Sequence, residues 1–157
     1  MIFRRIALLL TGLVAVLAIA GPAKAATSQV KLRNQATGTK LMTRDASSLV
    51  SMKNAGAANQ VWTKTDLTGG YATYSQLSPQ GTQLCLTGRG LQGFPVVTAE
   101  KCLAGATKQQ WRKGVSGDLQ LRLNGLVAEV NTASAANQVR MAFFVAKPNQ
   151  KWFVLPA

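Results

Sequence analysis

Three copies of a short motif, Gln-x-Trp, constrain the fold of this chain more than any other feature. The motifs read NQVW at residues 59–62, KQQW at 108–111 and NQKW at 149–152, and together they contain every tryptophan of the protein. The tryptophans are separated by 49 and then 41 residues. This spacing predicts three copies of one structural unit of about 45 residues.

Each motif follows two stretches of alternating apolar and polar residues that flank a turn. The turns read TGTK at residues 37–40, QGTQ at 80–83 and NGLV at 124–127. Period-two alternation bounded by glycine and asparagine predicts half-buried strands joined as hairpins. Outside the N-terminal segment no window sustains a helical period, so we expect an all-β fold.

The N-terminal segment has the organisation of a secretory signal peptide. Arg4 and Arg5 precede the apolar run 6–20, and the small-residue sequence AKA follows at 23–25. The run is shorter than the roughly 20 residues that a membrane-spanning helix needs. We therefore expect a signal peptide at residues 1–25, cleaved after Ala25. The mature chain, 26–157, is expected to be extracellular or periplasmic and to lack a transmembrane segment, with an uncleaved anchor as the alternative.

The mature chain is predicted to be strongly basic. Without residues 1–25 it has 15 lysines and arginines against five acidic residues. Such a charge favours polyanionic partners such as acidic glycans or anionic lipid. The basic residues are scattered and never form a run longer than two, so we expect no nucleic-acid partner. The alternative interpretation is that the charge serves only solubility.

Cysteine and histidine content limits the chemistry. Cys85 and Cys102 are the only cysteines, and in an exported chain they predict a disulfide bond. There is no histidine, which argues against a zinc site and removes Ser-His-Asp and Cys-His nucleophile systems. The five acidic residues show no spacing typical of a glycosidase pair. We expect no catalytic residue, no metal and no cofactor.

With these features the chain resembles the ricin B-type lectin family over the whole of residues 26–157. The resemblance rests on the three motifs in register, on Cys85-Leu86 after a glycine turn, and on a second cysteine nine residues before Trp111. It implies a β-trefoil, which is twelve strands in three lobes around a pseudo-threefold axis. The lobes are expected at about 28–68, 69–115 and 116–157, with Trp62, Trp111 and Trp152 buried as structural residues.

The family resemblance also implies where a sugar pocket would lie in each lobe. A carboxylate follows the first cysteine position, an aromatic ring precedes the second by two residues, and the Asn and Gln of the Asn-Gln-x-Trp motif complete the pocket. Hydroxyl groups need acceptors and donors, and the apolar face of a sugar suits a flat ring. Counting from the turns and tryptophans pairs Cys85 with Met42 and Val127, and Cys102 with Met52 and Phe143.

The third lobe is the best candidate for such a pocket. It has Glu129 at the carboxylate position and retains Asn149 and Gln150. The aromatic position falls on Arg140 or Met141, so Phe143 or Phe144 would have to supply the ring. The predicted carbohydrate-binding set is therefore Glu129, Phe144, Asn149 and Gln150.

The other two lobes fit the pattern less well. The first keeps Asn59 and Gln60 but has Arg44 and Val50 at the carboxylate and aromatic positions, and Asp45 would substitute only after a one-residue slip. Asp45, Asn59 and Gln60 form a weaker candidate set. The second lobe has Thr87, Glu100 and Lys108 at the carboxylate, aromatic and asparagine positions, and we interpret its pocket as lost. The glutamine of all three motifs also has a structural role available beside a buried tryptophan.

These observations favour a secreted, non-catalytic carbohydrate-binding module with partly degenerate pockets. Its partners would be glycans or glycoconjugates. Three alternatives remain: a protein-interaction or cell-binding subunit of a toxin-like complex, a charge-driven binder of acidic glycans, and a protease inhibitor acting through the loop 86–96.

Overall fold

The computed structural model describes residues 25–92 and 95–157. The predicted signal peptide lies outside these residues except for Ala25. No helix in the described part of the chain is long and apolar enough to cross a membrane. The strands are β1 (Thr27–Asn34), β2 (Leu41–Arg44), β3 (Val50–Lys53), β4 (Trp62–Asp66), β5 (Tyr71–Leu77), β6 (Gln83–Thr87), β7 (Thr98–Lys101), β8 (Trp111–Lys113), β9 (Leu119–Leu121), β10 (Val127–Val130), β11 (Val139–Ala142) and β12 (Trp152–Pro156). Single-turn 3-10 helices are η1 (Gln35–Thr37), η2 (Thr68–Gly70), η3 (Thr107–Gln109) and η4 (Pro148–Gln150).

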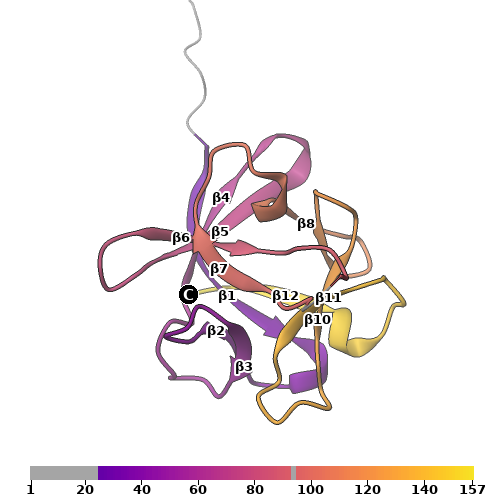
Figure 1. Cartoon of the computed structure of the whole chain (residues 1–157). Helices are drawn as coiled ribbons and strands as arrows, with labels where there is room; N and C mark the ends of the chain where they lie inside the picture. The colour runs from indigo at the N-terminus through magenta and orange to yellow at the C-terminus, as the bar shows by residue number, and fades with distance from the viewer. Residues whose placement is uncertain (1–24, 93–94) are drawn as a thin grey trace, which may run out of the picture.

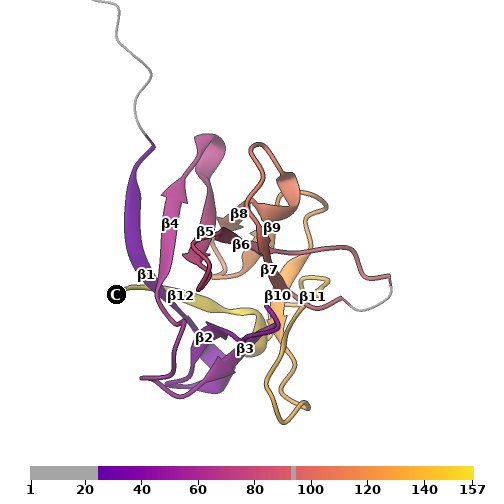
Figure 2. The same ribbon diagram turned by 60° about the vertical axis from the view of Figure 1, so that its left-hand side comes forward.

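The strands form a six-membered layer and three hairpins. Strands β12, β1, β4, β5, β8 and β9 pair antiparallel in that order. The two ends of the layer meet where the Trp152 N–H donates to the Gly117 carbonyl at 2.8 Å, just before β9. The hairpins are β2–β3, β6–β7 and β10–β11. Figure 2 shows β1, β4 and β5 side by side with the β2–β3 hairpin folded beneath them.

The three hairpins meet around a common axis. One cross-strand pair occupies the same place in each of them: Thr43–Ser51, Thr87–Thr98 and Glu129–Arg140. The second residue of each pair also bridges to a neighbouring hairpin, in the contacts Leu49–Thr98, Val96–Arg140 and Ser51–Gln138. The same contact thus closes a ring of three lobes, and the predicted all-β trefoil is confirmed.

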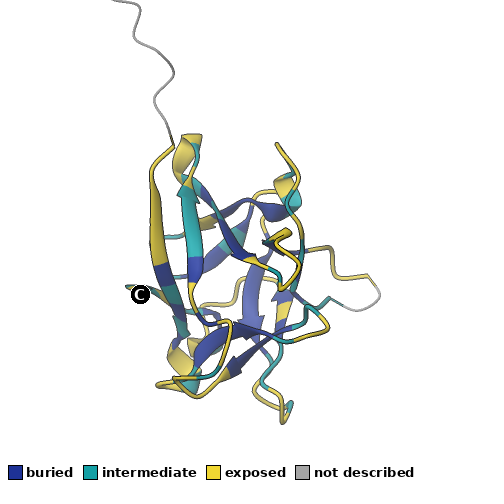
Figure 3. Ribbon diagram, turned by 90° about the vertical axis from the view of Figure 1, so that its left-hand side faces the viewer, coloured by how far each residue is buried: buried dark blue, intermediate teal, exposed yellow. Residues whose placement is uncertain are grey.

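The motif tryptophans form the centre of the core. Trp62, Trp111 and Trp152 are at most 1% exposed. Their indole N–H groups donate to the backbone carbonyls of Met42 at 3.3 Å, Leu86 at 2.8 Å and Ala128 at 2.9 Å. Each indole therefore fixes the last strand of its lobe against the second, as a buried donor must find an acceptor. Figure 3 shows the buried strands surrounded by exposed loops.

The indole bonds also correct the predicted alignment of the lobes. Because Met42, Leu86 and Ala128 accept the same bond, the counterparts of Cys85 are Leu41 and Val127. The pairing of Cys85 with Met42 was wrong by one residue, whereas its pairing with Val127 was correct. Leu41 and Met42 are both buried apolar residues, so their chemistry does not show which one lies at the cysteine position.

A second set of bonds corrects the other end of the hairpins. The motif glutamines donate to the carbonyls of Asn54, Lys101 and Phe143. The counterparts of Cys102 are therefore the following residues, Ala55 and Phe144, and not Met52 and Phe143. Met52 instead pairs with Met42 within β2–β3. Counting back from the tryptophan failed because the segments between hairpin and motif differ in length.

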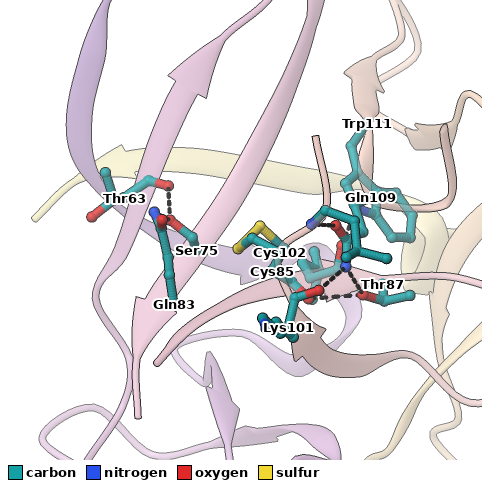
Figure 4. Close-up of a disulfide and its surroundings, with 11 residues drawn as sticks. Thr63, Ser75, Gln83, Cys85, Thr87, Lys101, Cys102, Gln109 and Trp111 are labelled. Atoms are coloured by element: carbon teal, nitrogen blue, oxygen red, sulfur yellow. Dashed lines mark hydrogen bonds between the residues drawn. A yellow bond between two sulfur atoms is a disulfide. The ribbon is translucent and has the colours of Figure 1, made fainter. Parts of the chain in front are cut away.

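The predicted disulfide joins Cys85 of β6 to Cys102, the residue after β7. Figure 4 shows it in the second lobe, where Gln109 donates to the carbonyl of Lys101, the residue before Cys102. A cross-link that closes a loop of this size stabilises a domain by about 3 kcal/mol in the chain-entropy model. It secures the lobe that carries the longest hairpin connection.

Candidate functional site

Strands β10 and β11 place Glu129 opposite Arg140 in the third lobe. The Glu129 side chain is only 8% exposed, and its Oε1 accepts bonds from Arg140 Nε at 2.9 Å and Nη2 at 2.6 Å. Its Oε2 accepts from Gln150 Nε2 at 2.9 Å. The predicted residues Glu129 and Gln150 are thus in direct contact. Arg140, which was predicted at the aromatic position, instead forms an ion pair with the carboxylate.

Gln150 ties this carboxylate to the segment that follows β11. It is fully buried, and its Nε2 also donates to the Phe143 carbonyl at 2.8 Å while its Oε1 accepts from the Val145 N–H at 2.8 Å. Gln60 and Gln109 make equivalent bonds in their own lobes. The motif glutamine therefore has a structural role in every lobe, and in the third it also holds Glu129.

Asn149 is held from two sides. Its Nδ2 donates to the Val130 carbonyl at 3.0 Å, and its own carbonyl accepts from Asn34 Nδ2 at 3.0 Å. Its Oδ1 is buried without a hydrogen-bond partner among the described residues. Buried acceptors are seldom left unpaired, but this oxygen has almost no accessible surface, so a ligand would contact it only after the Asn149 side chain turns.

Asn34 is a positioning residue that the sequence did not reveal. It lies fully buried at the end of β1, directly opposite Trp152. Gln76 of β5 plays the same part in the first lobe, where its Nε2 donates to the Asn59 carbonyl at 2.8 Å. The available clue was a buried amide near the end of the first strand of one lobe, which bonds to the motif of the lobe before it, but recognising this bond requires the strand register.

The aromatic position of the third lobe holds no ring. Counting two residues back from Phe144, the counterpart of Cys102, gives Ala142. The assignment of this position to Arg140 or Met141 was therefore wrong, and Met141 lies in the core at 1% exposure. Phe144 is 43% exposed in the segment after β11, between the two residues whose backbone groups bond Gln150.

The first lobe has neither a carboxylate nor an aromatic ring at the corresponding pocket positions. Thr43, not Arg44, occupies its carboxylate position, and its Oγ1 donates to the Ala58 carbonyl at 2.5 Å. Lys53, not Val50, occupies its aromatic position. Asp45 lies in the β2–β3 turn, where its Oδ1 accepts from the Ser47 hydroxyl and the Leu49 N–H.

The two remaining first-lobe candidates line a hollow of about 520 Å³ beside β1 and β5. Asn59 donates to the Arg44 carbonyl at 3.2 Å, and Gln60 donates to the Asn54 carbonyl at 2.8 Å. The structure therefore brings Asn59 and Gln60 together in one hollow. Asp45 is not among the residues that line it.

In the second lobe Glu100 occupies the aromatic position and is bonded by side chains of the same lobe. Glu100 accepts bonds from Arg89 at 2.7 and 3.2 Å, from Lys108 at 2.9 Å and from the Thr98 hydroxyl at 3.1 Å. Burial acts to raise the pKa of Glu100, but these hydrogen bonds outweigh burial and hold the pKa below its usual value. Thr87, at the carboxylate position, accepts from Gln109 Nε2.

The lowered pKa of Glu100 predicts a defined acid sensitivity. A carboxyl whose pKa is depressed by folding contributes stability above its unfolded pKa of about 4.3, and this contribution is lost as the pH falls through the folded value. Glu100→Gln should therefore flatten the acid side of a plot of Tm against pH. Thermal denaturation between about pH 2 and pH 6 measures this. Equal slopes for the variant and the wild type would contradict the assignment.

Residues 28–152 match the family model described as the ricin-type beta-trefoil lectin domain. The chain belongs to this family. The family is one of carbohydrate-binding modules, and the resemblance predicted from the Gln-x-Trp repeats is confirmed. No curated protein matches the chain in a sequence comparison.

Solved ricin-type lectins and β-trefoil toxins share the fold. A mosquitocidal holotoxin matches with a TM-score of 0.69 at 18% identity, over 84% of this chain and 17% of that chain. A non-toxic homologue of type II RIPs from Momordica charantia, in complex with α-methyl-D-galactoside, matches with a TM-score of 0.62 at 12% identity, over 84% and 48%. The Haemophilus ducreyi cytolethal distending toxin matches with a TM-score of 0.64 at 15% identity, over 91% and 95%. The chain thus spans only a small part of the holotoxin but almost all of the last chain.

Proposed function

We propose that this protein is a secreted, non-catalytic carbohydrate-binding module with partly degenerate pockets, whose main sugar site lies in its third lobe. The observation that carries the proposal is the contact of Glu129 with Gln150, beside Asn149. In the first and second lobes the position of Glu129 is taken by Thr43 and Thr87, which have no carboxylate.

Three groups would bind the ligand. Glu129 Oε2 accepts one bond in the protein, from Gln150, and a carboxylate oxygen can accept a second from a sugar hydroxyl. Asn149 Oδ1, which is buried and has no partner among the described residues, would accept another once its side chain turns toward the ligand. The exposed ring of Phe144 would stack on the apolar face of the sugar. Such a shallow site would bind weakly, with Asp45, Asn59 and Gln60 as a secondary set.

The contacts of Glu129 support a binding role. Arg140 occupies its Oε1 and Gln150 donates to its Oε2, so the group is fixed in place as a hydrogen-bond acceptor. Secretion is supported by the predicted signal peptide and by the disulfide, which persists in oxidising compartments.

Two observations favour second candidates. The Arg140 side chain is 44% exposed beside the site, which would suit acidic glycans recognised by charge. The match over almost the whole length of a cytolethal distending toxin chain would suit a cell-binding or protein-interaction subunit of a toxin-like complex. In that case the gene should lie next to that of an enzymatic partner.

A glycan array probed at low salt and at about 0.5 M salt tests the proposal, because high salt screens exposed charges. We expect salt-tolerant binding to particular sugars, reduced about tenfold or more in Glu129→Gln and Asn149→Ala. Lys108→Ala, at the equivalent motif position of the second lobe, is the matched control and should bind nearly as well as the wild type. Binding abolished by salt would point to charge alone, and the absence of signal in both conditions would refute a sugar site.

A further inference from the structure

Three consecutive large apolar residues are exposed directly after β11. Phe143 is 70% exposed, Phe144 43% and Val145 54%. Figure 1 shows the yellow segment between β11 and η4 projecting from the right-hand side of the molecule. Contiguous exposed apolar side chains of this size typically mark an interaction surface.

The backbone of this segment is held firmly. The buried Gln150 side chain donates to the Phe143 carbonyl and accepts from the Val145 N–H, both at 2.8 Å. These bonds turn the backbone polar groups inward and leave the apolar side chains outward. The exposed surface is therefore a fixed feature of the fold.

The pseudo-symmetry provides an internal comparison. The equivalent segments, held by Gln60 and Gln109, are Asn54-Ala55-Gly56 in the first lobe and Lys101-Cys102-Leu103 in the second. The first is small and polar, and the second is anchored by the disulfide. Holding this segment in place therefore does not require apolar side chains, and those of the third lobe need another explanation.

Positive charge lies beside the apolar segment. Lys147 is exposed next to it and Lys151 is half-buried just after η4. Gln150, which bonds the backbone of this segment, also contacts the acidic residue Glu129. Glu129 is buried, and its charge is neutralised by Arg140. Apolar side chains that enter the boundary between headgroups and acyl chains, flanked by cations that meet lipid phosphates, are typical of proteins that dock on anionic bilayers.

We propose that residues 143–147 form a docking surface for an anionic phospholipid membrane. Phe143 and Val145 would enter the interface while Lys147 contacts lipid phosphates. A sugar at the proposed third-lobe site would use only the Phe144 ring and would leave Phe143 and Val145 exposed. The two proposed sites share Phe144, but the variants that test the docking surface leave Phe144 unchanged, so the two proposals can fail separately.

Co-sedimentation of the mature chain with vesicles tests the docking surface. We expect binding to phosphatidylglycerol–phosphatidylcholine vesicles and much weaker binding to pure phosphatidylcholine. The double variant Phe143→Ser/Val145→Ser should lose about tenfold or more in partition, and Lys147→Gln about fivefold. Leu103→Ser, at the counterpart of Val145, is the matched control and should partition like the wild type. Thermal denaturation confirms that each variant is folded.

A fluorescent reporter gives a second readout. Because the native tryptophans are buried, the indole of a Phe143→Trp variant would be the responsive one, with blue-shifted emission and quenching by brominated lipid on anionic vesicles. A Leu103→Trp variant should show neither change. Equal partition of the double variant and the wild type would overturn the proposal. Absence of binding to anionic vesicles would also overturn it and would leave an acidic protein surface as the partner to test.

Discussion

Replacing Trp111 with alanine is expected to lower the free energy of unfolding by about 3–5 kcal/mol, because the change removes a fully buried indole and leaves a cavity. The indole bond to the Leu86 carbonyl, 2.8 Å long, would also be lost. Packing around this ring is tight: a Cβ placed on Gly88 would lie 2.8 Å from Trp111 Cη2 and 2.9 Å from Leu121 Cδ2. The surroundings are therefore poorly able to fill the cavity by relaxation.

Urea denaturation followed by circular dichroism measures this loss, which should appear in thermal scans as a fall in Tm on the order of 10 °C. Trp111→Phe keeps much of the ring and should cost less than Trp111→Ala. Leu77→Ala, at a side chain that is 69% exposed, is the surface control and should change stability by less than about 0.5 kcal/mol. A Trp111→Ala variant within about 1 kcal/mol of the wild type would show that the indole is not central to the core.

The repeat of Gln-x-Trp was sufficient to predict the fold, because the same physical role recurs in each lobe. Each tryptophan is buried and donates to the second strand of its own lobe, so the motif had to be retained three times. The hairpins followed from period-two alternation, and the disulfide from two cysteines in a chain that was expected to be exported. These inferences depend only on local pattern and composition.

The register within the hairpins could not be predicted in the same way. Leu41 and Met42 are both buried. Leu41 is equivalent to Cys85 and Met42 to Leu86, but apolar chemistry alone does not show which is which. A one-residue slip moves every side chain to the other face of a strand. It was therefore enough to misplace Arg44 at a position that Thr43 occupies.

The candidate site was predicted in part. Glu129, Asn149 and Gln150 were named from the motif, and the structure brings them together. The ion pair of Glu129 with Arg140 and the support of Asn149 by Asn34 depend on pairing between strands, which one sequence does not reveal. Whether these residues bind sugar remains a prediction.

Gln150→Glu is expected to be among the most damaging substitutions of a single atom in this protein. The new carboxylate would keep its bond from the Val145 N–H, but the other oxygen would replace an N–H group that lies 2.9 Å from Glu129 Oε2 and 2.8 Å from the Phe143 carbonyl. Two buried carboxylates at this separation cannot both be ionised without a large cost. We expect a loss of about 3–5 kcal/mol near neutral pH, as for an uncompensated buried charge.

The expected pH dependence distinguishes this effect from a simple packing defect. The carboxylate pair would bind a proton at a pH above the unfolded value of about 4.3, so stability should recover as the pH falls through the raised pKa of the pair. Gln109→Glu is the matched control, since its nearest side-chain partner is the Thr87 hydroxyl at 3.1 Å, which can turn to donate if it gives up its bond to the Cys85 carbonyl. Urea denaturation at about pH 5 and about pH 8 should show a large pH-dependent loss for Gln150→Glu and a smaller, flatter loss for Gln109→Glu. Equal losses at both positions would mean that Gln150 does not hold Glu129, and the third-lobe site would lose its defining contact.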